Sequence, residues 1–210
     1  MCFRQKKLYK LYPFIELVKK LESLTIRARA AYGFLCVENA LMHYHVCGEE
    51  WNKIVTYLWK YTTLDYGGGV CPLDRWADNT ITNLYTFVRE SYEEYISSPY
   101  RDYMFPEDIL SEEEYIRLQK AVISQGNQVI FDISCQAHLA ATYEMDGGQR
   151  GVSITTEEII NLVRILVANG IPLPDITPLM CHSKNAKGGK DSDGWGATFD
   201  GIKYSKFLQS

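Results

Sequence analysis

The stretch LTIRARAAYGFLCVENALMHYHV, residues 24–46, decides the fold class of this chain of 210 residues. Apolar residues recur in it at helical spacing, from Ile26 through Val37 to Tyr44, and no proline interrupts them. The stretch is also several times longer than an ordinary β-strand. We therefore expect one long helix here, with Ser23 as its N-cap residue.

The same patterning continues on both sides of this stretch. Ser111 followed by Glu114, and Thr155 followed by Glu158, have the spacing of a capping box, which starts a helix. We found no internal repeat and no sustained alternation typical of strands, so we expect an all-α, multi-helix bundle of about seven helices in a single domain, residues 1–210. Besides 24–46, the predicted helices are 13–21, 49–62, 79–95, 112–125, 127–145 and 156–169.

The connections and the C-terminal segment are expected to be irregular. Residues 70–74 are predicted as a loop or a short turn after three consecutive glycines, and the prolines between 172 and 178 break regular structure. Residues 183–196 are rich in Lys, Gly, Asp and Ser, which predicts a mobile loop within the domain. The aromatic residues that follow suggest that the end of the chain folds back onto the bundle.

Composition limits the classes of function. The hydrophobic share of 46% and the charged share of 23% are typical of a soluble globular protein. The net charge of -4 argues against nucleic acid as the partner, because phosphate binding needs a basic surface. The six cysteines form no CxxC pair and no run of residues is apolar enough for a membrane span. We expect reduced thiols, no membrane partner and a cytoplasmic location.

Glu38 is the most informative polar residue, because it lies among apolar positions of the long helix. On a helical wheel it falls close to Arg27 and His45. A carboxylate in such surroundings needs a partner or its pKa rises. We therefore predict that Arg27, Glu38 and His45 form a buried polar group with a structural role. A functional polar site remains the alternative.

A metal centre is the second reading of these polar residues. Glu38 could join Asp132 and His138, which lie in another apolar helical segment, as ligands of a metal-dependent helical-bundle enzyme. The di-iron pattern needs a repeated Glu-x-x-His motif, and the sequence lacks it. His43 and His45 would point about 200° apart on one helix, which prevents them from sharing an ion. We expect no metal and no cofactor, and the metalloenzyme remains the alternative.

Other catalytic patterns are weak. Asp191, Asp193 and Asp200 fall short of a calcium-binding loop, and Cys181 beside His182 does not by itself define a catalytic pair. The sequence contains neither a P-loop nor a nucleophile elbow. We therefore expect that the chain is not an enzyme.

Residues 30–65 carry a resemblance to a known family. A helix centred on Cys36-Val37-Glu38 is followed by Glu50-Trp51-Asn52-x-Ile54 and then by Leu58-Trp59-Lys60-Tyr61. This order resembles the all-α immunity proteins of bacterial polymorphic toxin systems, the immunity protein six family among them. The resemblance implies stoichiometric binding and neutralisation of a cognate toxin domain, often a nuclease, with no chemistry by this chain. The oligomeric state is left open, and a helical scaffold or regulator is a third hypothesis.

Inhibitors of basic toxins present acidic and aromatic side chains to their targets, because opposite charge raises the association rate. The sequence offers such side chains between residues 90 and 108. A solvated acidic face is the alternative explanation of the same charges. The candidate partner-binding residues are Glu90, Tyr92, Glu93, Glu94, Tyr95, Tyr100, Asp102, Tyr103, Glu107 and Asp108.

Overall fold

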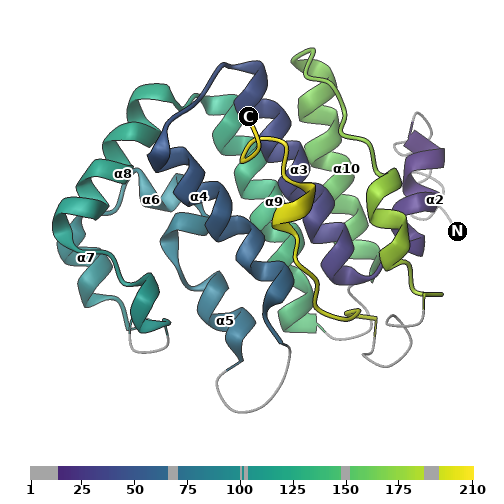
Figure 1. Ribbon diagram of the computed structural model, residues 1–210, viewed down its shortest axis with the longest axis horizontal. Helices are drawn as coiled ribbons and strands as arrows, with labels where there is room; N and C mark the ends of the chain where they lie inside the picture. The colour runs from purple at the N-terminus through teal and green to yellow at the C-terminus, as the bar shows by residue number, and fades with distance from the viewer. Residues whose placement is uncertain (1–13, 66–70, 100, 102–103, 148–151, 187–193) are drawn as a thin grey trace, which may run out of the picture.

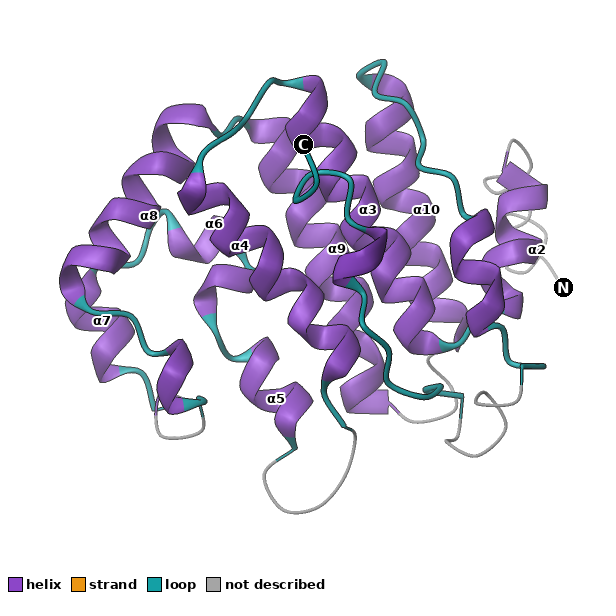
Figure 2. Cartoon of the chain, viewed as in Figure 1, coloured by secondary structure: helices purple, strands orange, loops and turns teal. Residues whose placement is uncertain are grey.

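The computed structural model describes residues 14–65, 71–99, 101, 104–147, 152–186 and 194–210, without the side chains of residues 143–147 and 152–154. These residues form helices and loops and no strand, so the predicted all-α class is confirmed (Figure 2). Six of the described helices have seven or more residues, where about seven helices were predicted. They are α2 (Ile15–Ser23), α3 (Ile26–His43), α4 (Glu49–Lys60), α8 (Glu112–Gln125), α9 (Gln128–Gly147) and α10 (Val152–Ala168).

Shorter helical segments connect and extend these six. The α-helical ones are α5 (Pro72–Ala77), α6 (Leu84–Phe87) and α7 (Tyr92–Ser97). The 3-10 segments are η2 (Tyr61–Thr63), η3 (Thr80–Thr82), η5 (Pro106–Asp108), η7 (Thr177–His182) and η8 (Ile202–Tyr204). Among the helices described, none combines the length and the apolar character that crossing a bilayer requires.

Helix α3 is the centre of the bundle and packs against α4, α9 and α10 (Figure 1). Fifteen of its 18 residues are buried, so its apolar residues surround the helix rather than form one stripe. Gly33 faces Ala137 of α9 and Ile159 of α10: a Cβ at Gly33 would lie 3.5 Å from the Ala137 Cβ and 3.1 Å from the Ile159 Cδ1. Small residues therefore allow the three helices to approach closely.

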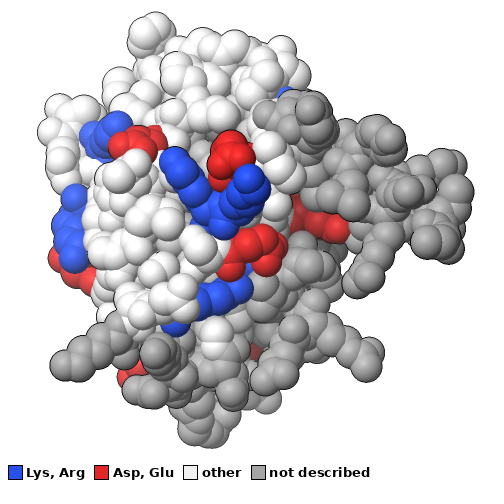
Figure 3. All heavy atoms as spheres, turned by 90° about the vertical axis from the view of Figure 1, so that its right-hand side faces the viewer, with Lys and Arg blue, Asp and Glu red and all other residues white. Residues whose placement is uncertain are grey.

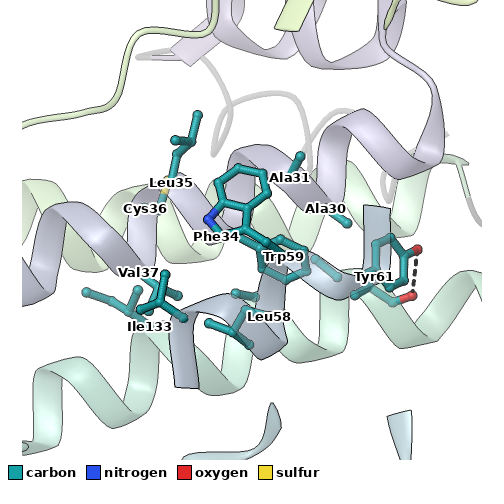
Figure 4. Close-up of a cluster of buried hydrophobic side chains, with 14 of the residues drawn as sticks. Ala30, Ala31, Phe34, Leu35, Cys36, Val37, Leu58, Trp59, Tyr61 and Ile133 are labelled. Atoms are coloured by element: carbon teal, nitrogen blue, oxygen red, sulfur yellow. Dashed lines mark hydrogen bonds between the residues drawn. The ribbon is translucent and has the colours of Figure 1, made fainter. Parts of the chain in front are cut away.

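An aromatic cluster joins α3 to the layer in front of it. The Phe34 ring meets the rings of Trp59 and Tyr61 edge to face, with 5.8 Å between centroids in both pairs (Figure 4). The Tyr61 hydroxyl donates a hydrogen bond to the Ala141 carbonyl of α9. Edge-to-face aromatic pairs contribute about 1 kcal/mol each beyond the area they bury. This cluster fixes α4 and η2 against the central helices.

The C-terminal segment completes the start of α3. The backbone N–H groups of residues 25, 26 and 27 donate to the carbonyls of His182, Gly194 and Trp195, respectively. The N–H of Ala28 donates to the side chain of Thr25, so Thr25 is the N-cap and the prediction of Ser23 was wrong. The first amides of a helix have no partner within it, and here carbonyls of residues 182–195 accept their hydrogen bonds. Within the predicted mobile loop 183–196, Gly194 and Trp195 accept two of these bonds and the N–H of Lys184 donates to the Ser23 carbonyl, while residues 187–193 lie outside the described residues.

Gly196→Ala is expected to lower the free energy of unfolding by about 3 kcal/mol, through backbone strain and a steric clash. Gly196 has a φ of +80°, and a Cβ there would lie 2.6 Å from the side chain of buried Thr25. Gly170→Ala is the matched control, because Gly170 has a φ of +68° and its Cβ would meet no atom within 4 Å. That variant should cost only the strain of about 1 kcal/mol. If urea denaturation gave equal losses of unfolding free energy for the two variants, the clash with Thr25 would contribute nothing to the effect.

The predicted helix 79–95 was wrong, because three separate short segments occupy this stretch. Side chains that accept hydrogen bonds from nearby backbone amides start each of them: Asn79 at η3, Asn83 at α6 and Ser91 at α7. Such local bonds compete with a continuous helix. Ser91 and Glu94 form a complete capping box. The stretch consequently folds as a compact set of turns and not as a rod.

Other boundaries also differ from the prediction. Helix α3 ends at His43 and not near Val46, because His45 adopts the left-handed conformation with a φ of +57°. Thr155 does not cap a helix, since α10 already begins at Val152. Part of the predicted loop 70–74 belongs to α5, which begins at Pro72 in the position that proline favours. By contrast, Ser111 caps α8 as predicted.

Candidate functional site

The predicted partner-binding residues divide between the surface and the core. Glu93 is exposed in the first turn of α7, and Glu94 is exposed while it caps that helix. Tyr92 is half-buried and donates to the Leu110 carbonyl. Tyr95 is 1% exposed, and its hydroxyl donates to the Asp108 carbonyl and accepts from the Leu110 N–H. It is therefore buried, and its choice as a surface binding residue was wrong. Tyr100, Asp102 and Tyr103 lie outside the described residues.

Asp108 and Glu107 lie at a separate place, beside the C-terminal end of α4. The Asp108 carboxylate is mostly buried and accepts hydrogen bonds from Lys60 at 2.5 Å and from the Tyr57 hydroxyl at 3.2 Å. Glu107 is exposed, 3.9 Å from the same Lys60. Lys60 also lies over the Phe105 ring, 4.3 Å from its centroid. Asp108 is therefore part of an internal network and is not available to a partner, whereas Glu107 remains on the surface.

Two of the remaining acidic candidates, Glu90 and Glu94, line a hollow between α6 and α7. We call it the acidic hollow, and its volume is about 430 Å³. The Arg89 guanidinium forms no ion pair with Glu90 or Glu94. It lies instead over the Tyr85 ring, 4.8 Å from its centroid. The residues that line it are Tyr85, Thr86, Arg89, Glu90 and Glu94.

Glu90 is the electrostatically unusual residue of the acidic hollow. Its backbone carbonyl accepts hydrogen bonds from the Tyr115 hydroxyl and the Gln119 amide, which fix the end of the turn. Partial burial, together with the negative charge of Glu94, raises the pKa of the Glu90 carboxyl, while hydrogen bonds oppose the rise. Among the described residues no Lys or Arg forms an ion pair with it. A cation that entered the hollow would stabilise its charged form.

The sequence did not indicate Tyr85 and Arg89 as site residues. Both belong to the stretch predicted as one helix, in which neither position was distinctive. Tyr85 also contacts α9, because its hydroxyl donates to Asp132 at 3.3 Å. The only signal in the sequence was the presence of Tyr, Arg and Glu residues between positions 85 and 94. These side chains come together around one hollow only because the chain turns at Ser91.

Of the three residues predicted to be buried, Arg27 and Glu38 are buried, but they bond different partners and do not form one polar group. Arg27 and Glu38 are 2% and 1% exposed. His45 is exposed, because α3 ends before it, and its inclusion was wrong. Arg27 donates to the Tyr61 carbonyl at 2.8 Å, and burial lowers the pKa of its guanidinium. Glu38 turns instead toward the Trp59 indole and the C-terminal segment.

The three proposed metal ligands have separate surroundings. Glu38 accepts from the Trp59 Nε1 at 2.6 Å, Asp132 contacts Tyr85 and Gln128, and the His138 ring stacks on Trp76. Within the described part of the chain, no group of three His, Cys, Asp or Glu side chains is arranged to hold a metal ion. The arrangement that the metalloenzyme hypothesis requires is therefore not formed by these residues.

The face at the right of Figure 1, which carries α2, provides a contrast to the acidic hollow. There the described Lys and Arg side chains lie directly beside Asp and Glu (Figure 3). Lys19 and Glu16 of α2 form one such exposed pair, at 2.7 Å. Mixed charge of this kind is the ordinary surface of a soluble protein and has little power to select a charged partner.

Comparisons of the chain with protein-family models, with curated proteins and with solved structures found no match.

Proposed function

We propose that this chain is an immunity protein that binds a cognate toxin domain of a bacterial polymorphic toxin system and neutralises it by stoichiometric occupation. The observation that carries the proposal is the acidic hollow, together with exposed Glu93, which precedes Glu94 in the first turn of α7. A binding protein needs a recognition surface and no catalytic group. The order of the helix centred on Cys36-Val37-Glu38 and the aromatic helix after it supports the same class.

The chemistry of the acidic hollow selects a basic partner. Glu90 and Glu94 line it, and Glu93 has no hydrogen bond or ion pair within the described part of the chain. A volume of about 430 Å³ admits a lysine or arginine side chain beside these carboxylates, while the Arg89 guanidinium already lies over the Tyr85 ring. Nuclease toxins carry basic surfaces because they bind phosphates. A nuclease domain is therefore the toxin that fits this surface best.

Charge changes in the acidic hollow test the proposal. The chain is co-expressed and purified with the toxin domain encoded beside its gene, and growth and the Kd of the complex are measured. The double variant Glu90→Gln with Glu93→Lys should weaken the complex by about 100-fold, because a half-buried carboxylate is neutralised and an exposed one is reversed. Glu94 is left unchanged because it caps α7.

The matched control is Glu49→Lys. Glu49 is exposed in the first turn of α4, and the neighbouring Cys47 amide bonds Gln125 at the C-terminal end of α8, away from α7. This variant should bind within about threefold of the unmodified protein, since a distant surface charge has little effect. The proposal fails if no complex forms and growth is not rescued. An equal effect of both variants would remove the acidic hollow as the binding face.

A further inference from the structure

A cluster of Cys181, His182 and Tyr204 lies far from the acidic hollow, where η7 meets η8. The Tyr204 hydroxyl oxygen is 2.9 Å from the His182 Nε2 and 3.5 Å from the Cys181 Sγ. The thiol is exposed and also lies 3.3 Å from the Pro178 carbonyl, to which it can donate. One hydroxyl group therefore links an accessible thiol to an imidazole nitrogen across 22 positions of sequence.

The imidazole of this cluster is held in place and is uncharged at neutral pH. Its ring stacks on Phe199, with 3.9 Å between centroids and 17° between planes. Partial burial, assisted by the positive charge of Lys203, lowers the pKa of His182. Burial and the contact with Cys181 raise the pKa of Tyr204 to about 12, so its hydroxyl keeps its proton. A neutral imidazole can accept a proton through a neutral hydroxyl.

A small cavity lies beside the thiol. Its volume is about 90 Å³. A single water needs roughly 10–15 Å³ of such space, so the cavity has room for a molecule of a few heavy atoms next to the exposed thiol. Its lining includes Thr25, Cys181, His182, Ser183 and Gly196.

We propose that Cys181 is a site of oxidation by small hydroperoxides, with Tyr204 and His182 as its proton relay. The S–H proton moves to the Tyr204 oxygen while the Tyr204 proton moves to the His182 Nε2. The resulting thiolate attacks one oxygen of hydrogen peroxide, so that an S–O bond forms and the O–O bond breaks. The departing hydroxide takes the proton back from the imidazolium and leaves as water. Sulfur loses two electrons, the peroxide gains them, and the product is a sulfenic acid.

Cys47 provides a control within the same molecule. The five described cysteines are free thiols, and Cys47 and Cys181 are the exposed ones. In the described part of the chain the Cys47 Sγ has no hydrogen bond to a tyrosine or histidine. A difference in rate between the two therefore measures the relay and not exposure.

The test treats the full chain with hydrogen peroxide, traps sulfenic acid with dimedone and quantifies each cysteine by mass spectrometry. Cys181 should react about tenfold faster than Cys47 at neutral pH, and Tyr204→Phe, which keeps the ring, should remove most of this advantage. His182→Gln should act in the same direction, with circular dichroism as the check that both variants fold. Equal rates at Cys181 and Cys47, or an unchanged Cys181 rate in folded Tyr204→Phe, would overturn the proposal.

Discussion

Replacing Glu38 by alanine is expected to lower the free energy of unfolding by about 4 kcal/mol, because three N–H donors lose one buried acceptor. The Trp59 Nε1 donates to one carboxylate oxygen at 2.6 Å, and the backbone N–H groups of Lys206 and Phe207 donate to the other at 2.9 and 3.3 Å. Glu38 is 1% exposed, so water cannot replace the lost oxygen atoms without opening the bundle. Urea denaturation followed by fluorescence measures the change.

Glu49→Ala is the control for this prediction, because Glu49 is exposed on another helix and its loss should change stability by less than about 0.5 kcal/mol. The C-terminal segment should respond first in Glu38→Ala, with faster hydrogen exchange at the amides of residues 206 and 207. A loss below about 1 kcal/mol for Glu38→Ala would mean that the three hydrogen bonds contribute little.

Glu38→Gln separates hydrogen bonding from packing. Glutamine has the same shape, but its amide offers one oxygen and two N–H donors, so one of the two donor sets must face another donor. The expected loss is on the order of 2 kcal/mol. Trp59→Phe removes the indole donor, and in that background the cost of Glu38→Gln should fall. Additive losses in this double-mutant cycle would contradict the assigned contact.

The burial of Glu38 was predictable from the sequence, whereas its partners were not. Its position among apolar residues of α3 is a local pattern, and α3 itself follows from helical periodicity. The partner groups are 21 positions away at Trp59 and 168 away at Lys206. No periodicity connects such distant positions. The same limit applies to the start of α3, where carbonyls near residues 182–195 replace the expected serine cap.

In the region of the acidic hollow, the sequence contained signals for short helices, but the apolar pattern outweighed them in the prediction. Ser91 with Glu94 has capping-box spacing, and Asn79 and Asn83 are residues that start helices, yet the apolar pattern of residues 84–92 favoured one continuous helix. Once the chain turns at Ser91, Tyr95 packs inward against Tyr115 and leaves Glu93 and Glu94 outside. The acidity of the site was therefore predictable, but its shape depends on that turn.

His138 should make the stability of the protein fall by up to about 3 kcal/mol as the pH drops from 6.5 toward 4. Its ring is stacked on Trp76, its Nδ1 is buried with no partner in the described part of the chain, and burial lowers its pKa from 6.5 to about 4. The unfolded chain therefore binds a proton below pH 6.5 that the folded chain does not bind until about pH 4. The stabilisation is complete above the unfolded pKa and is lost as the pH falls through this window.

The comparison of the protein with its His138→Phe variant isolates this contribution. Phenylalanine can keep the stacking on Trp76 and cannot titrate, so its free energy of unfolding should depend less steeply on pH between 6.5 and 4.5. The lowered pKa of His182 acts in the same direction and remains in both proteins, so it cancels in the difference. His45→Asn removes an exposed imidazole from the end of α3, and asparagine tolerates the left-handed backbone there, so this variant should keep the steep dependence. If His138→Phe kept the same slope instead, the titration of His138 would not be the cause of the pH dependence. Removing a group whose pKa is lowered by folding must also remove its share of the stability lost in acid.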